Sequence, residues 1–192
     1  KSLESDDVDV FLGNWMPAMA SISDPYIDKG QVDRPRANLQ GAKYTLAVPQ
    51  YVLDAGVTSV ADLADNLEKF DGRIYGIEAG NDGNMIIADM IDDDAFGMGE
   101  FEMIDSSEAG MLAEVKSKIA AEEWVVFLGW EPHPMNTRFE MGYLEGADDY
   151  FGPNLGGATV YTNTRAGYSE ACTNVGALLS NLEFTLEMEN QL

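Results

Sequence analysis

The sequence contains very little cysteine, histidine and positive charge, and it lacks any long hydrophobic run. A single cysteine, Cys172, excludes an internal disulfide, and with one histidine, His133, neither a zinc site nor a Cys–His nucleophilic pair is expected. No stretch approaches the ~18 consecutive apolar residues of a transmembrane helix. No basic segment is followed by an apolar one, so we expect no signal peptide within the chain.

Positive charge is scarce relative to negative charge. Only 11 lysines and arginines stand against 34 aspartates and glutamates, which gives a formal net charge of −23. Because phosphate groups are bound by lysine and arginine, this balance argues against nucleic acids and anionic membranes as partners. Two interpretations stay open: a solubilising acidic surface, and a negative field that attracts a cationic solute.

The motifs of the common catalytic and metal sites are also missing. There is no G-x-S-x-G elbow, and a Ser–His–Asp triad would have to use His133 between Pro132 and Pro134. The glycine-rich turn Glu78–Gly83 has the wrong spacing for a dinucleotide or phosphate loop. The aspartate clusters do not match an EF-hand and indicate solvated faces. We therefore expect no catalytic residue, no metal, no cofactor and no enzyme activity.

What the sequence does contain is enough apolar residues, 45%, for one or two globular domains. Strand-like and helical stretches alternate, which predicts βαβ units and a mostly parallel sheet. The expected strands are Val8–Leu12, Gly41–Val48, Gly72–Ile77, Phe101–Ile104, Trp124–Leu128, Phe139–Leu144 and Ala158–Thr162. The expected helices are Val57–Phe70 with Ser59 and Asp62 as a capping box, Asn84–Asp92, a helix from Ser106 or Ser107 to Ala121, and Asn174–Leu192. Residues 18–38 are expected to be loop with a short helix.

Two tryptophans occur in matched contexts. Trp15 lies in VFLGNWMP and Trp130 in VFLGWEP, and each apolar run is expected to end at its glycine and place the tryptophan in the following loop. Open α/β sheets bind ligands at the carboxyl ends of their strands. Two aromatic faces at such ends could enclose a cation. The alternative is that each indole packs in a core, which is the role we expect for Trp124.

Tyr44 and Asn81 are further candidates with equally plain structural alternatives. Tyr44 in GAKYTLA fits a core aromatic of a strand. Asn81 in the turn before a helix fits a turn former, because asparagine tolerates unusual backbone geometry. As a ligand residue, Asn81 would offer an amide donor and acceptor beside a helix amino end.

Several longer motifs together resemble the periplasmic choline-binding proteins of ABC transporters, within the wider group of glycine-betaine and quaternary-amine substrate-binding proteins. These motifs are FLGNWMP, GAKYTLA, IYGIEAGNDGN, FLGWEPHPMN, FGPNLGGATVYTN and RAGYSEACTNVGALLSNLEFTLEMEN. They follow one another along nearly the whole chain.

The resemblance implies an α/β fold of the two-lobed periplasmic binding protein type (type II). Residues 1–43 and 161–192 would belong to the first lobe and residues 44–160 to a complete second lobe. The first lobe would be truncated at both ends, since the chain begins at Lys1 without an initiator methionine and ends at Leu192 within a helical pattern.

By motif, Trp15, Tyr44 and Trp130 would form an aromatic box around a trimethylammonium group, and Asn81 would bind the ligand's polar end. The implied protein captures choline in the periplasm and delivers it to a membrane permease. Glycine betaine, carnitine and trimethylamine N-oxide remain alternatives, and Arg165 is the base to watch for a carboxylate. An unrelated doubly wound α/β enzyme and an acidic domain without a ligand are the alternatives outside this class.

Overall fold

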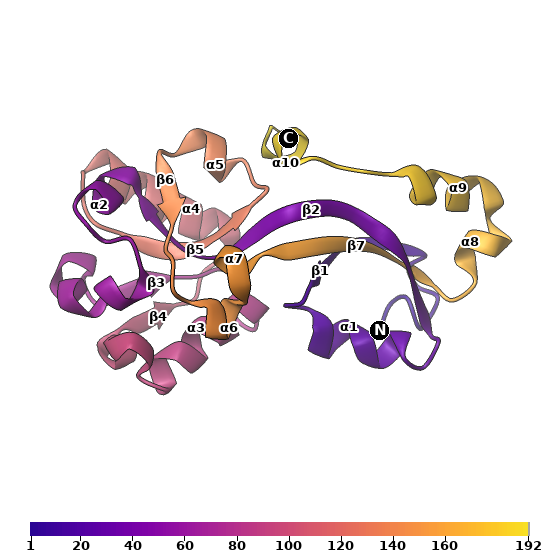
Figure 1. The fold of residues 1–192 in the computed structure, drawn as a ribbon, viewed down its shortest axis with the longest axis horizontal. Coiled ribbons are helices and arrows are strands. Elements are labelled where there is room, and N and C mark those ends of the chain that lie inside the picture. Colours follow the sequence, from indigo (N-terminus) through magenta and orange to yellow (C-terminus); the bar gives the residue numbers. More distant parts are fainter. Residues whose placement is uncertain (192) are drawn as a thin grey trace. The chain divides into compact units, whose positions relative to one another are not determined.

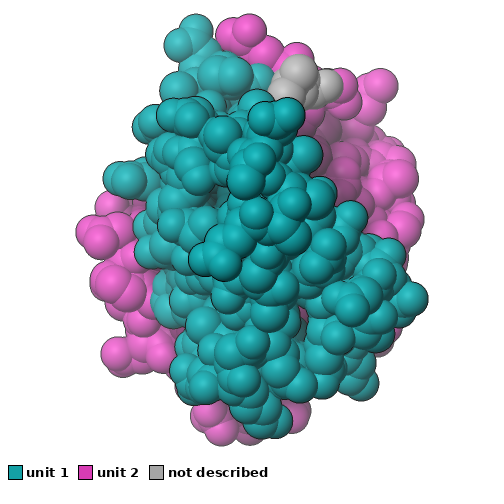
Figure 2. Space-filling view, turned by 90° about the vertical axis from the view of Figure 1, so that its right-hand side faces the viewer, with its two compact units in different colours: residues 1–42, 158–189 teal, residues 43–157, 190–192 magenta. Residues whose placement is uncertain are grey.

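The longest strand, β2 (Val32–Pro49), contributes to both of the two units into which the chain divides. The structure is a computed structural model that describes residues 1–191. Unit 1 comprises Lys1–Ala42 and Ala158–Glu189, and unit 2 comprises Lys43–Gly157 with the short segment that begins at Asn190 (Figure 2). Figure 1 shows the order of the elements along the chain.

Unit 1 is built on an antiparallel arrangement in which β7 (Ala158–Arg165) pairs with β1 (Val10–Met16) on one side and with the first part of β2 on the other. Its helices are α1 (Ala20–Ile27), α8 (Tyr168–Ala171), α9 (Thr173–Asn181) and most of α10 (Leu186–Asn190). Its small apolar core consists of Leu39, Ala42, Ala158 and Val160, against which Trp15, Phe184 and Leu186 pack.

Unit 2 contains a mixed sheet. Strand β3 (Arg73–Tyr75) pairs in parallel with β4 (Glu102–Ile104) and with β5 (Val126–Glu131). The end of β2 pairs antiparallel with β5 and with β6 (Met141–Tyr143). The middle strands are rich in fully buried side chains such as Leu46, Phe127 and Leu128, which is typical of a sheet covered on both faces.

The two longest helices of unit 2 begin at residues whose side chains cap them. Asn81 caps α3 (Asp82–Asp92), and Ser107 caps α4 (Glu108–Ala120) by accepting a hydrogen bond from the Gly110 amide at 3.1 Å. The remaining helices are α2 (Gln50–Asp54), α5 (Met135–Arg138), α6 (Asp148–Phe151), α7 (Pro153–Gly156) and 3₁₀ helices over Val60–Asp62, Ala64–Phe70 and Ala95–Glu100.

The structure confirms most predicted strands but corrects the sheet type. Only the β3–β4 and β3–β5 pairs are parallel within residues 1–191, so the prediction of a mostly parallel sheet is wrong. The prediction of loop up to residue 38 is also wrong, because β2 begins at Val32. Alternation of strands and helices along the sequence does not show that β2 pairs antiparallel with strands distant in sequence, such as β5 and β7.

Two predicted helices also differ from the structure. The capping box of Ser59 and Asp62 is confirmed, but residues 60–70 wind as 3₁₀ rather than α-helix. The last predicted helix is interrupted after Asn181, and Leu178 on its expected apolar side is 61% exposed. Leu192, the predicted end of that helix, lies outside the described residues.

Candidate functional site

Tyr44 and Trp130 lie directly opposite each other on β2 and β5. The register of this antiparallel pair places Tyr44 against Trp130 and Leu46 against Leu128. Directly opposed residues project to the same face of a sheet with their Cβ atoms about 5 Å apart. Two of the predicted ligand residues, 86 positions apart in sequence, are therefore neighbours on one face of unit 2. Both side chains are half-buried.

The amino end of α3 packs on this same face. A Cβ atom on Gly83 would lie 2.3 Å from the Tyr44 hydroxyl and 2.7 Å from Leu128 Cδ2, so only glycine fits there. Leu128 precedes Trp130 by two residues and shares its face of the strand. The glycine thus lets the first turn of α3 approach the two aromatic residues closely.

The Tyr44 hydroxyl both donates and accepts hydrogen bonds. It donates toward Asn81 Oδ1 at 2.9 Å and Asp82 Oδ1 at 3.1 Å, and it accepts a hydrogen bond from the Gly83 amide at 3.0 Å. Burial, followed by the charge of Asp82, raises the pKa of the Tyr44 phenol well above its ordinary value. The ring also makes an edge-on contact with Phe151, at 5.9 Å between centroids. Tyr44 is therefore a neutral aromatic group with a fixed orientation.

Asn81 caps α3 rather than forming a turn of unusual geometry, since its backbone is in the extended region (φ −64°, ψ 145°), and its side chain retains one further capacity. Its Oδ1 caps α3 by accepting from the Gly83 amide at 2.9 Å and the Asn84 amide at 3.4 Å. Within residues 1–191, its amide nitrogen Nδ2 makes no hydrogen bond. The side chain is only partly buried, so this nitrogen can donate to a bound solute.

A loop after β5 fixes Trp130 from behind. The Asn136 amide nitrogen donates to the carbonyls of Trp130 and His133, both at 2.9 Å, and its oxygen accepts from the Tyr143 hydroxyl at 2.6 Å. The His133 ring lies against the indole of Trp130, with centroids 4.8 Å apart and planes at 60°. The tryptophan is thus held by a hydrogen-bonded loop rather than by core packing alone.

Trp15 belongs to unit 1. It is the penultimate residue of β1, pairs with Val160 of β7 and packs against the small apolar core of that unit. Trp130 is likewise the penultimate residue of β5, so the prediction that the two indoles lie in loops is wrong. The matched contexts extend to the backbone, since Met16–Pro17 and Glu131–Pro132 are both cis peptide bonds.

Trp124 and Arg165 both have partners within the protein, which indicates structural roles. Trp124 meets Phe70 edge-on at 5.3 Å and carries the Lys69 ammonium 4.3 Å from its ring centre, as expected for a structural tryptophan. Arg165, the base considered for a carboxylate, donates to Asp9 at 2.6 Å and lies 4.8 Å from the Tyr168 ring centre. Its charge is therefore already balanced within unit 1.

Sequence reasoning missed His133 and Asn136 as supports of Trp130, and Asp82 as a partner of Tyr44. His133 was considered only as a zinc ligand or a catalytic group. The available signal was the segment PHPMN directly after GWE, which places a ring and an amide within six residues of the indole. Asp82 follows Asn81 in the first turn of α3, where acidic residues are common for reasons of capping alone.

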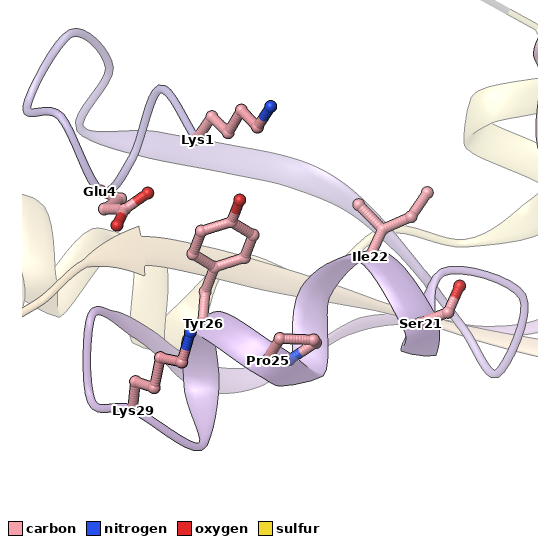
Figure 3. A pocket seen from close by; sticks show the side chains of 7 residues that line it. All are labelled: Lys1, Glu4, Ser21, Ile22, Pro25, Tyr26 and Lys29. Atoms are coloured by element: carbon pink, nitrogen blue, oxygen red, sulfur yellow. The ribbon is translucent and has the colours of Figure 1, made fainter.

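A pocket of about 530 Å³ in unit 1 is a poor candidate for a cation site (Figure 3). It contains one aromatic ring, Tyr26, and two ammonium groups, Lys1 and Lys29, which would repel a cation. Its other lining residues are Glu4, Ser21, Ile22 and Pro25. Across residues 1–191, no group of three or more histidine, cysteine, aspartate or glutamate side chains is placed to hold a metal ion.

Comparison with known families gives one match over the whole chain. The family model OpuAC, described as the substrate-binding domain of ABC-type glycine betaine transport systems, matches residues 1–192. Within the described chain, no helix has the length and apolar character needed to cross a bilayer.

Known relatives and solved structures agree with this match. An ABC-transporter choline-binding protein, solved in complex with choline, is 52% identical and superposes with a TM-score of 0.90 over 98% of this chain and 65% of its own. The uncharacterized protein ORF1 of Chromohalobacter salexigens is 72% identical over 82 residues, which are 43% of this chain and 53% of that protein. The glycine betaine/carnitine transport binding protein GbuC of Listeria monocytogenes is 25% identical over 62% of this chain and 39% of its own.

The chain thus spans less than two thirds of the length of each of these relatives. The structural likeness confirms the predicted α/β fold of the type II periplasmic binding proteins.

Proposed function

The chain belongs to the OpuAC family of substrate-binding domains of ABC-type glycine betaine transport systems, and on that premise we propose that it captures choline between aromatic walls and delivers it to a membrane permease. The family consists of binding proteins rather than enzymes, so the alternative of a doubly wound enzyme is set aside. The protein would act in the periplasm. Residues 44–160 would form one lobe, and residues 1–43 with 161–192 would belong to the other.

The observation that carries the proposal is the cross-strand pair of Tyr44 and Trp130, with the Asn81 amide bonded to the Tyr44 hydroxyl. A quaternary ammonium has no N–H group, so hydrogen-bond acceptors cannot hold it directly. Aromatic faces can, at roughly 0.5–2 kcal/mol for each contact. Trp15, in a context matching that of Trp130, would supply a further wall from the other lobe.

The energies show why several walls are needed. Three contacts at the upper end amount to ~6 kcal/mol before the costs of binding. Micromolar affinity corresponds to about 8 kcal/mol. The remainder would come from the polar end of the ligand and from apolar burial of its methyl groups.

Choline is favoured over glycine betaine by the groups available for that polar end. A betaine carboxylate requires a strong donor, and Arg165 is occupied by Asp9. Lys43 is bonded to Glu131 at 2.7 Å, and these two residues alternate with Tyr44 and Trp130 and so face the other side of the sheet. Asn81 Nδ2 offers a neutral donor, which suits the hydroxyl of choline. The 52% identical protein solved with choline supports the same solute.

Tryptophan fluorescence and calorimetry test the proposal. We expect choline to change the emission of the wild-type protein, and Trp130→Leu to remove most of that change and weaken binding about tenfold. Trp124→Phe is the matched control, because Trp124 packs on Phe70 and Lys69 away from the pair, and it should keep the response. Titrations with glycine betaine, carnitine and trimethylamine N-oxide rank the alternatives. Absence of heat and of spectral change with every quaternary amine would overturn the proposal.

A further inference from the structure

His133 has hydrogen bonds that fix which of its ring nitrogens carries the proton. Nδ1 lies 3.0 Å from the Met135 backbone nitrogen, which donates to it, and Nε2 lies 3.1 Å from Glu108 Oε1. A ring nitrogen that accepts a hydrogen bond must present its lone pair. The hydrogen-bond network therefore assigns the neutral tautomer with hydrogen on Nε2, donated to Glu108.

The ring of His133 cannot move without affecting Trp130. The two rings are in contact, with centroids 4.8 Å apart. The backbone of His133 is fixed as well: its amide donates to Asn190 Oδ1 at 2.8 Å, and its carbonyl accepts from the Asn136 side chain. The side-chain torsions are thus the freedom left to this residue, and the Met135 and Glu108 contacts set them.

We propose that His133 is a positioning residue for Trp130, and that only its neutral form holds the indole in the geometry that binds a quaternary amine. This inference rests on the proposed function and adds regulation by pH to it. Protonation places a hydrogen on Nδ1, which then faces the Met135 N–H, so two donors meet and that hydrogen bond is lost. It also puts a positive charge beside the indole, where it opposes a cation bound at the same aromatic group.

Charged side chains from three elements lie around His133. Glu108, on α4, lies 3.1 Å from His133 Nε2, and its backbone amide donates to Glu78 Oε1 at 3.2 Å. Lys116 of α4 and Arg138 of α5 line the same pocket of about 420 Å³ as His133. Glu131 of β5 is bonded to Asn190 and Lys43. The Met135 N–H belongs to the backbone and does not titrate, so it remains a donor directed at Nδ1 at every pH.

Choline affinity measured by calorimetry from pH 8.0 to 5.5 tests the inference. Histidine changes charge between about pH 5 and 8, so we expect the wild-type protein to bind choline roughly three- to tenfold more weakly at the acid end. His133→Phe keeps a ring against Trp130 but cannot be protonated, and its affinity should not vary with pH. His133→Asn keeps an acceptor for the Met135 amide, because asparagine can bond the backbone two residues on. It too should bind with one affinity at all pH values.

The single histidine allows a second, direct readout. Its imidazole gives the only histidine signal in a proton–carbon spectrum. By linkage, a ligand that prefers the neutral form must move the midpoint of that titration to lower pH, by the same factor as the affinity change. A purely structural histidine would show no such shift.

The outcomes separate the two proposals. Tight choline binding with a flat wild-type profile and an unmoved histidine signal would overturn the role of His133 and leave the proposed function intact. Equal pH slopes in the wild type and in both His133 variants would do the same. Absence of binding by any quaternary amine at pH 8.0 would overturn the proposed function, and the inference with it.

Discussion

Replacing Tyr44 by phenylalanine separates the two roles that the structure gives this residue. The ring would be a wall for a trimethylammonium group, whereas the hydroxyl ties β2 to the first turn of α3 through Asn81, Asp82 and Gly83. Tyr44→Phe removes only the hydroxyl and keeps the edge-on contact with Phe151. Tyr44→Leu removes the aromatic face as well. The two variants should therefore have different effects on stability and on binding.

The contacts set the size of each effect. Tyr44→Phe loses one donated and one accepted hydrogen bond, but the Gly83 amide keeps Asn81 Oδ1 at 2.9 Å as an acceptor. At about 1 kcal/mol net for each bond, the free energy of unfolding should fall by roughly 1–2 kcal/mol. The aromatic face remains, so the Kd for choline should rise less than about threefold. Tyr44→Leu loses a contact worth ~0.5–2 kcal/mol, which is about a 2- to 30-fold rise in Kd.

Urea denaturation and isothermal calorimetry with choline measure both quantities on the same samples. Because the chain has two units, unfolding should be followed by two probes, and its free energy used only where the transitions coincide. The reasoning would be refuted if phenylalanine and leucine weakened choline binding equally, because the ring face would then contribute nothing. It would also be refuted if Tyr44→Phe left stability unchanged.

Two further predictions concern unit 2. Asn81→Asp keeps an oxygen to cap α3 but loses the Nδ2 donor. The choline hydroxyl can donate to the new carboxylate instead, whereas the carboxylate of glycine betaine would be repelled by it. The variant should therefore hold the melting temperature and choline binding while reducing any binding of glycine betaine, and Asn81→Ala should cost about 1 kcal/mol of stability. Equal loss of both ligands in Asn81→Asp would contradict this. The pKa of Tyr44 is raised by burial and then by Asp82, and that of Tyr143 by burial and then by Glu131. Above about pH 10 the unfolded chain loses these phenol protons and the folded chain keeps them, so the free energy of unfolding should fall as pH rises. Urea midpoints between pH 8 and 11 should fall less steeply in Tyr44→Phe, and an equal slope would count against the assignment.

Local patterns in the sequence predicted the features that depend on neighbouring residues. The Ser59–Asp62 capping box forms because each group satisfies a backbone amide within three positions. Asn81 has a local structural role, although it caps α3 with an extended backbone and does not form the turn of unusual geometry that one interpretation expected. The strand at Gly72–Ile77 and the helix after Ser107 were found to within a few residues. Each of these depends on contacts that a short window of sequence contains.

The pairing of strands distant in sequence could not be predicted from local patterns, also for a physical reason. Trp130 pairs with Tyr44 on the neighbouring strand. Neither segment, taken alone, shows which of its residues will lie opposite which residue of the other. Register follows from the burial of Leu46 and Leu128 on one face and from the close approach of Gly83. The resemblance of the motifs supplied both residues as candidates, but it gave no reason why their side chains should be adjacent. That reason is the antiparallel pair of β2 and β5, which the prediction of a mostly parallel sheet did not identify.

The charged groups near Tyr44 and Trp130 are consistent with the scarcity of positive charge in the sequence. The ammonium of Lys43, the basic group nearest to Tyr44 in sequence, bonds Glu131 on the opposite side of the strand pair, whereas Asp82 and Glu108 bond Tyr44 and His133. Charges in water are screened within about 8 Å at physiological salt, so the net charge of −23 acts chiefly on how fast a cation arrives. Retention requires contacts that do not need a hydrogen-bond donor on the solute. The neutral rings of Tyr44 and Trp130 meet that requirement, and a carboxylate placed against a methylated nitrogen would meet it less well, because its desolvation opposes the attraction.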